Sequence, residues 1–116
     1  MKMIFMSAQQ HDISAAYVSH MSHISSFVLS LAVLDKEKNN KNILNLASGG
    51  FASTVRLAKS SAEMWVPIFE QNSKYILEVV DTYIDKLQEF RKSIKENKKD
   101  HLEILISKAN QIQKIL

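Results

Sequence analysis

Residues 13–34 read ISAAYVSHMSHISSFVLSLAVL, and this stretch, which contains no Asp, Glu, Lys or Arg, decides the fold. Its apolar residues recur at the spacing of one helical face: Ile13, Tyr17, Ile24, Phe27, Val28 and Leu31. Ser7 and Gln10 form a capping-box pattern, so we expect the helix to begin at about Ala8 and to run to about Leu34.

The same stretch is long enough to span a bilayer. It nevertheless contains six serines and two histidines, which are costly to place in hydrocarbon. We therefore predict a helix buried in protein rather than in a membrane.

The rest of the chain also shows helical patterns and no strand alternation, which predicts an all-α fold. Two long helices are expected, the first described above and a second from Ile68 to about Glu96, with Asn97, Lys98 and Lys99 breaking the second. Between the two long helices we expect a polar turn at 35–42, a short helix through Ile43, Leu44 and Leu46 that stops at Gly49, and another helix at about 52–59. A capping box at Ser60 and Glu63 should follow, and then a kink or restart at Pro67. A last helix, capped by Asp100 and Glu103, should reach Leu116.

Length and composition indicate one globular domain, residues 1–116. The chain has no cysteine, which excludes disulfides and thiolate chemistry and fits a cytoplasmic location. The net charge is +3, and the lysine clusters at 36–41 and 92–99 lack interleaved aromatic or arginine residues, so we expect no nucleic-acid partner.

No metal, nucleotide or nucleophilic site is predicted. His11, His20 and His23 form no i,i+4 pair and lack a third ligand. Two glycines supply neither a three-glycine dinucleotide fingerprint nor a phosphate loop, so we expect this chain to bind no cofactor. No strained turn or orienting acid supports a Ser–His nucleophile.

The long helices predict a homodimer. A helix of about 28 residues reaches about 42 Å, which exceeds a compact monomer of this size. The uncharged first helix also needs cover on most sides. An intertwined helical dimer meets both requirements.

Arg56 is the strongest candidate for ligand binding. It is one of two arginines in the chain and follows Gly49 and Gly50, the only glycines. A guanidinium offers paired donors to a carboxylate or phosphate, and amides after a glycine turn at a helix start face the same anion. The alternative is a salt bridge to a neighbouring helix.

A second stripe of small and polar residues runs along the first helix: Asp12, Ala16, Ser19, His23, Ser26 and Ser30. It permits either close helix packing or a polar pocket. His23 is a pocket candidate or an interface histidine, whereas His20 lies nearer the apolar face and is expected to be a core residue.

Six elements, in order and spacing, resemble the C-terminal domain of prephenate dehydrogenases of tyrosine biosynthesis. The family pattern reads roughly HD, SHxPH, GGFxDxTRxAxSxPxMW and IFxxN, and the resemblance covers about residues 6–72. The matching residues are His11-Asp12, Ser19-His20-Met21-Ser22-His23, Gly49-Gly50-Phe51, Arg56-Leu57-Ala58, Met64-Trp65, and Phe69 with Asn72.

The resemblance implies the dimer-forming and prephenate-binding part of a two-domain enzyme, inactive by itself. An N-terminal Rossmann domain, absent from this chain, would bind NAD and carry the catalytic histidine. The full enzyme would convert prephenate to 4-hydroxyphenylpyruvate by oxidative decarboxylation.

The resemblance also implies residue roles. Arg56 would bind a prephenate carboxylate, and Gly49 and Gly50 would let the backbone approach the substrate. His23 and Ser19 would line the pocket. Trp65 would wall it, or would simply be a core residue, and His11 with Asp12 would fix the helix start or the domain junction.

The chain departs from the family pattern at four positions. Ser22 and Ala62 replace prolines, and Val55 replaces a threonine. Ser53 replaces an aspartate, which changes the charge of the pocket and leaves arogenate open as the substrate. A helical homodimeric interaction module without catalytic activity is the alternative from another class.

Overall fold

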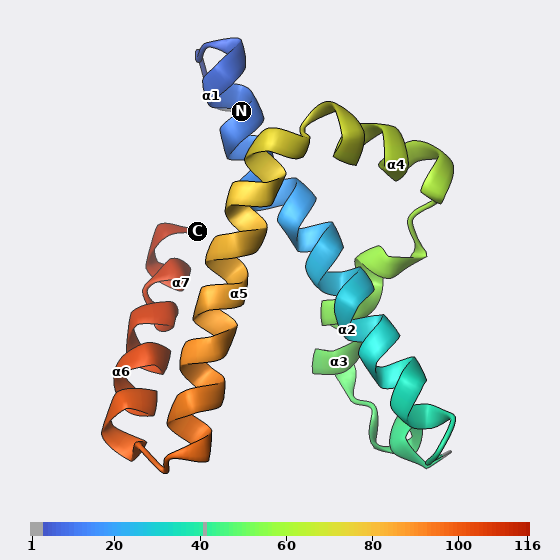
Figure 1. Ribbon diagram of the computed structural model, residues 1–116, viewed down its shortest axis with the longest axis vertical. Helices are drawn as coiled ribbons and strands as arrows, with labels where there is room; N and C mark the ends of the chain where they lie inside the picture. The colour runs from blue at the N-terminus through green and yellow to red at the C-terminus, as the bar shows by residue number, and fades with distance from the viewer. Residues whose placement is uncertain (1–3, 41) are drawn as a thin grey trace. The chain divides into compact units, whose positions relative to one another are not determined.

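The computed structural model describes residues 4–40 and 42–116 (Figure 1). All regular structure within these residues is helical, which confirms the all-α prediction. The chain forms two compact units that divide between Val79 and Val80, inside the helix α5 (Ser73–Lys95).

The first unit begins with one continuous helical run, composed of α1 (Ala8–Ala15), a π-helical segment η1 (Ala16–His20) and α2 (Met21–Glu37). The predicted capping box forms, because the Ser7 hydroxyl accepts from the Gln10 amide at 3.1 Å and the Gln10 side chain accepts from the Ser7 amide at 3.2 Å. The run ends three residues beyond the predicted end.

The π segment is a feature that the helical periodicity does not predict. Within it, the Met21 amide donates to the Ala16 carbonyl, five residues back rather than four. Segments of this kind insert one residue into a helix, and they are frequent at functional sites.

The two glycines begin a helix instead of ending one. The 3₁₀ turn η2 (Ile43–Leu46) stops because Ala47 and Ser48 are extended, and α3 (Gly49–Val55) starts directly afterwards. Neither glycine has a positive φ. The prediction of a C-terminal glycine at Gly49 was therefore wrong, and the 3₁₀ turn η3 (Arg56–Lys59) follows α3.

The helix α4 (Ala62–Gln71) differs from its prediction at two places. Its N-cap is Ser61 rather than Ser60, and the Ser61 hydroxyl accepts from the Met64 amide at 3.3 Å. Pro67 lies inside α4 without ending it. The proline removes one bond, to the carbonyl of the exposed Glu63, which water is able to satisfy. The break falls instead at Asn72, the C-cap.

The second unit contains the end of α5, α6 (Lys99–Asn110) and the single turn α7 (Ile112–Ile115). The predicted break after α5 is present. Asn97 has a φ of 53°, the Lys98 amide donates to the Ser93 carbonyl at 2.8 Å, and the Asn97 amide donates to the Ile94 carbonyl. This is a Schellman-type end with asparagine in the left-handed position.

The predicted cap of α6 was wrong. The N-cap is Lys98, which makes no side-chain bond, and Asp100 lies in the first turn, where its charge complements the helix dipole. The chain turns again at Gln111, so the last predicted helix is divided.

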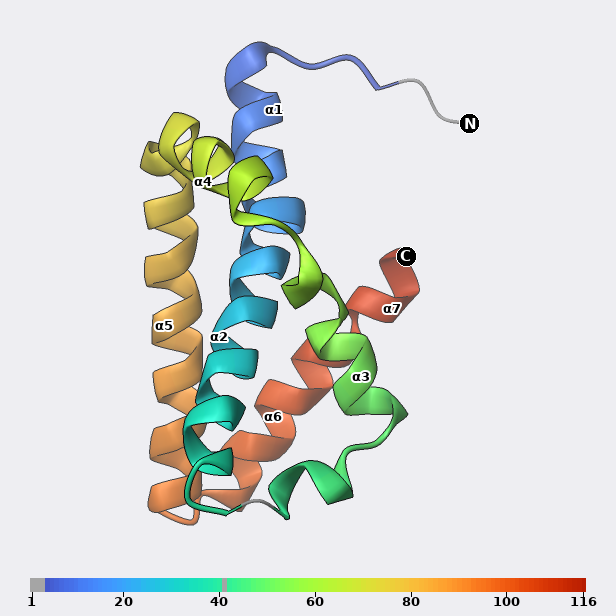
Figure 2. The same ribbon diagram turned by 90° about the vertical axis from the view of Figure 1, so that its right-hand side faces the viewer.

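In the first unit part of the stripe of small and polar residues faces inward, whereas Asp12 at its start is exposed. Ala16 and Ser26 are fully buried, and α3 and η3 pack beside α2, as Figures 1 and 2 show. The predicted apolar face is only partly covered, since Tyr17, Val28 and Leu31 are 50%, 57% and 61% exposed. The prediction that this helix is buried therefore does not hold within a single copy of the chain.

By length and composition alone, Ala8–Glu37 is able to cross a membrane, with a mean hydropathy of 1.3 over its most apolar window. A core helix passes the same test. The polar contacts of its inward face, described below, are made to protein groups.

Candidate functional site

The centre of the candidate site is a stack between α2 and α4. The rings of His23 and Trp65 lie with their centroids 3.6 Å apart and their planes inclined by 25°. Phe27 of α2 and Phe69 of α4 extend the cluster. Trp65 is 7% exposed, so its indole is a core group that also forms a wall beside His23.

The hydrogen bond of His23 defines where its proton lies. Its Nδ1 is 3.0 Å from the backbone carbonyl oxygen of Ser19. A carbonyl oxygen can only accept, so Nδ1 carries a hydrogen. In the neutral ring Nε2 is then an acceptor. Ser19, predicted to line a pocket, contributes its backbone to this bond and is half-buried.

His20 is held differently, by Asn72 at the end of α4. The Asn72 side-chain nitrogen donates to the backbone carbonyl of Asp12 at 2.8 Å and lies 3.2 Å from His20 Nδ1. The His20 ring also meets Trp65 edge to face, with centroids 6.0 Å apart. His20 therefore belongs to the same cluster as His23, as a half-buried residue rather than a fully buried one.

Burial lowers the pKa of His20 below its ordinary value of 6.5. The charge that His23 carries when protonated lowers this pKa further, Asp12 raises it, and His11 lowers it. The neutral imidazole of His20 is therefore favoured.

A cavity of about 310 Å³ lies beside His20. Its lining comes from α1, η1 and the end of α4: His11, Asp12, Ala15, His20, Ile68, Gln71 and Asn72. Because the cavity reaches His20 and Asn72, solvent protons have access to this pair.

Arg56 is exposed at the first position of η3. The turn packs on α2 through the half-buried Leu57 and Ala58. Within residues 4–40 and 42–116 no ion pair involves Arg56, so the interhelical salt bridge considered above does not form there.

Gly49 and Gly50 lie in the first turn of α3, and both are exposed. A Cβ added to Gly49 would meet nothing within 4 Å, and one added to Gly50 would lie 3.8 Å from the Ser48 hydroxyl. The fold itself therefore does not need glycine at either position.

Ser26 ties α2 to α3. Its hydroxyl, 1% exposed, donates to the backbone carbonyl of Thr54, which precedes Arg56 by two residues. Of the two interpretations of the small-residue stripe, close helix packing describes Ala16 and Ser26, whereas Ser19 and His23 lie in the aromatic and histidine cluster.

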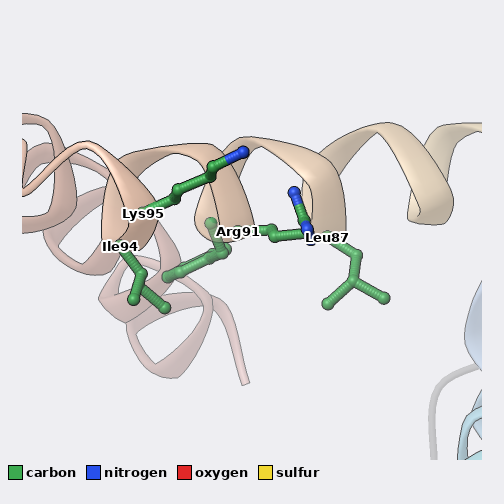
Figure 3. Close-up of a pocket in the computed structure, with 5 residues that line it drawn as sticks. Leu87, Arg91, Ile94 and Lys95 are labelled. Carbon is green, nitrogen blue, oxygen red and sulfur yellow. The ribbon is translucent and has the colours of Figure 1, made fainter.

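The second unit contains a different kind of hollow, of about 580 Å³ (Figure 3). Its floor is apolar, and Arg91 and Lys95 also line it, together with Leu87, Phe90 and Ile94. Polar groups that could orient a small substrate do not converge there. It is typical of a helix face that another helix covers.

In the part of the chain that the structure describes, no three His, Cys, Asp or Glu side chains come together as metal ligands. The residue whose role sequence reasoning missed is Asn72. It ends the family-like pattern, but its contacts with Asp12 and His20, far away in the sequence, depend on how α4 crosses η1.

The architecture defines an all-α domain in which the long first helix and α4 together form a cluster of histidine and aromatic side chains, and in which the first helix has an exposed apolar face. A family profile described as "Prephenate dehydrogenase, dimerization domain" matches residues 7–108. The chain belongs to that family.

One relative and two solved structures illustrate the similarity. Cyclohexadienyl dehydrogenase of Zymomonas mobilis is 32% identical over 98 residues, which cover 84% of this chain and 33% of the relative. Synechocystis arogenate dehydrogenase has the same fold with a TM-score of 0.89 and 23% identity, over 98% of this chain and 42% of that one.

Prephenate dehydrogenase from A. aeolicus, solved in complex with hydroxyphenyl propionate and NAD+, superposes with a TM-score of 0.83 and 24% identity. That match covers 97% of this chain and 40% of the other. The chain thus spans about a third of the length of the curated relative that it matches.

Proposed function

We propose that this chain is the substrate-binding and dimer-forming helical part of an NAD-dependent prephenate dehydrogenase. The family match over residues 7–108 carries the proposal. The reaction would be the oxidative decarboxylation of prephenate to 4-hydroxyphenylpyruvate, a step of tyrosine biosynthesis, in a protein that also contains a nucleotide-binding domain.

The residues of this chain do not fit a dinucleotide. Two glycines at the start of a short helix provide no three-glycine turn between a strand and a helix. NAD, which accepts the hydride, would be held by the other domain, and the work of this chain is to bind and orient the substrate.

Arg56 would bind a carboxylate of the substrate. Its guanidinium is exposed and without an ion pair in the described chain, so it is free to accept an anionic ligand. Gly49 and Gly50 begin α3, the helix that precedes Arg56, and the open space beside them would let the substrate approach the backbone.

His23 and Trp65 would form a wall of the substrate pocket. In its neutral state His23 offers an acceptor at Nε2, because Nδ1 is engaged with the Ser19 carbonyl. Trp65 offers an aromatic surface to a six-membered ring, and His23 already stacks on it.

A second copy would cover the exposed apolar residues of η1 and α2. Tyr17, Val28 and Leu31 lie exposed on a helical run that has no Asp, Glu, Lys or Arg from residue 13 to residue 34. The apolar hollow at Leu87 and Ile94 is a further surface that a helix could cover. We propose a homodimer on these grounds.

Sedimentation of the chain at micromolar concentration tests the dimer, and a dimer is the expected species. Flotation with neutral lipid vesicles is the control for a membrane-bound helix. A monomer in sedimentation, or co-flotation with vesicles, would contradict the proposed dimer.

A chimera tests the activity. The chain replaces the matching third of the Zymomonas mobilis relative, and NADH formation is followed with prephenate and, separately, with arogenate. We expect turnover of prephenate by the chimera and none by the chain alone.

The two substrates also decide the specificity. Preference for arogenate would assign the chain to that substrate and would point to Ser53, which stands where the family pattern has aspartate. A folded chimera that binds NAD but turns over neither compound would favour the helical interaction module.

A further inference from the structure

One amide group connects the end of α4 to two points of the first helix. The Asn72 nitrogen lies 2.8 Å from the Asp12 carbonyl oxygen and 3.2 Å from His20 Nδ1. Asp12 lies in α1, before the π-helical segment, and His20 is the last residue of that segment. The arrangement therefore fixes how α4, and with it Trp65, meets the first helix.

The chemistry of the two partners leaves one assignment. The Asp12 carbonyl can only accept, so the atom of Asn72 beside it is the NH₂ nitrogen rather than the oxygen. That NH₂ group has a second hydrogen, and His20 Nδ1 is the acceptor within reach. An accepting Nδ1 requires the proton of neutral His20 to be on Nε2.

His20 and His23 thus hold their protons on opposite nitrogens. His23 donates from Nδ1 to the Ser19 carbonyl and is left with an accepting Nε2, whereas His20 is left with a donating Nε2. Both rings contact Trp65. The wall therefore offers one donor and one acceptor from two neighbouring imidazoles.

We propose that Asn72 is a positioning residue, which holds His20 as the Nε2–H tautomer against Trp65 and opposes its protonation. Its bearing on substrate binding rests on the proposed function. The contact between Asn72 and His20 lies entirely within this chain, so the proposed role of Asn72 and the proposed function can be contradicted separately.

Protonation of His20 would break this arrangement. A hydrogen on His20 Nδ1 would face the NH₂ group of Asn72, which is also a donor. If the Asn72 amide rotated to offer its oxygen to that hydrogen, the oxygen would also face the Asp12 carbonyl, which is also an acceptor. The charged groups around His20 are His23 of α2 and His11 and Asp12 of α1, whereas α4 contributes the neutral Trp65 and Asn72. The lowered pKa of His20, caused first by burial, agrees with this direction.

Nitrogen-detected NMR of the imidazoles in the unmodified chain is the first test, with His→Asn variants used to assign the four histidines. Above the titration range we expect His20 to carry its proton on Nε2 and His23 on Nδ1. A His20 ring with its proton on Nδ1 would overturn the proposal without any change at Asn72.

Variants of Asn72 are the second test. Asn72→Ala removes the donor to Nδ1, so the midpoint of His20 should move to higher pH. Asn72→Asp is nearly isosteric and places an acceptor there, so the midpoint should move higher still. Gln71→Ala, at a neighbouring amide of the same cavity, should leave it unchanged.

A purely structural role for Asn72 does not predict this order. Equal midpoints in the unmodified chain and both Asn72 variants would overturn the proposal. Trp65 is the only tryptophan, and a protonated imidazole quenches its fluorescence. Because both His20 and His23 contact its indole, the fluorescence of variants that also carry His23→Asn provides a second readout of the same order.

Discussion

The imidazole of His23 on α2 lies stacked against the indole of Trp65 on α4, with 3.6 Å between the ring centroids. Stacked or edge-to-face aromatic contacts add to the energy of area burial. Phe69 and His20 contact the same indole, which makes Trp65 the centre of the packing between these helices.

Trp65→Ala is therefore expected to lower the free energy of unfolding by about 3–5 kcal/mol, the usual cost of removing a large buried aromatic side chain. Urea unfolding followed by circular dichroism measures this effect. Glu70→Ala, an exposed position of the same helix, should change the free energy of unfolding by less than about 0.5 kcal/mol. Equal effects of the two variants would show that the stack does not stabilise the fold.

Ser26→Ala tests the bond between α2 and α3. The carbonyl of the exposed Thr54 loses its side-chain donor, so the free energy of unfolding should fall by about 0.5–1.5 kcal/mol, the net worth of one hydrogen bond. Ser22→Ala is the matched control, because the exposed Ser22 hydroxyl bonds only to the Val18 carbonyl of its own helix. Chemical denaturation of both variants at one protein concentration measures this difference. An unchanged free energy of unfolding in Ser26→Ala would show that this hydrogen bond does not stabilise the fold.

Gly50→Ala separates folding from binding. The added methyl group has room, and alanine favours a helix over glycine by up to about 1 kcal/mol, so the chain should be as stable or more stable. In the chimera with the Zymomonas mobilis relative, the same methyl group should raise the substrate KM if the backbone approaches the substrate. A more stable protein with unchanged KM would exclude this backbone from the pocket.

The pH dependence of stability should reveal His20. Burial and the neighbouring His23 lower the pKa of His20 in the folded chain below 6.5, its ordinary value. The stability that neutral His20 contributes is thus fully present above pH 6.5 and is lost as the pH falls through the lower folded pKa.

His20→Asn keeps an acceptor for Asn72 and removes the titration. Between about pH 8 and about pH 5 its free energy of unfolding should fall less than that of the unmodified chain. Both proteins retain His11, His23 and His101, so the difference isolates His20. If the free energy of unfolding depended on pH equally in the two proteins, the lowered pKa assigned to His20 would be contradicted.

Local sequence signals predicted the elements whose causes are local. The Ser7 and Gln10 pair sets the start of the first helix, and Asn97 ends α5 in a left-handed conformation. The glycines were misread because the extended Ala47 and Ser48 had already ended the preceding turn. The helix does not restart at Pro67, because one missing bond at an exposed carbonyl does not break a helix that packing supports.

The site could be predicted only as separate pieces. His23 and Trp65 were identified as candidates, but their stacking depends on the crossing of α2 and α4, which no single-helix pattern contains. The contacts of Asn72 depend on the same crossing. The exposed Tyr17 and Leu31 were expected to be covered, since helical periodicity identifies an apolar face without identifying what covers it.

The proposed binding role of Arg56 is tested most directly by steady-state kinetics of Arg56→Ala in the chimera with the Zymomonas mobilis relative. A charge-assisted hydrogen bond is worth about 1.5–3 kcal/mol, so the KM for prephenate should rise by at least about tenfold. Lys59→Ala, at an exposed cation of the same turn η3, should leave KM unchanged. An unchanged KM in Arg56→Ala, or an equal rise in both variants, would contradict the account.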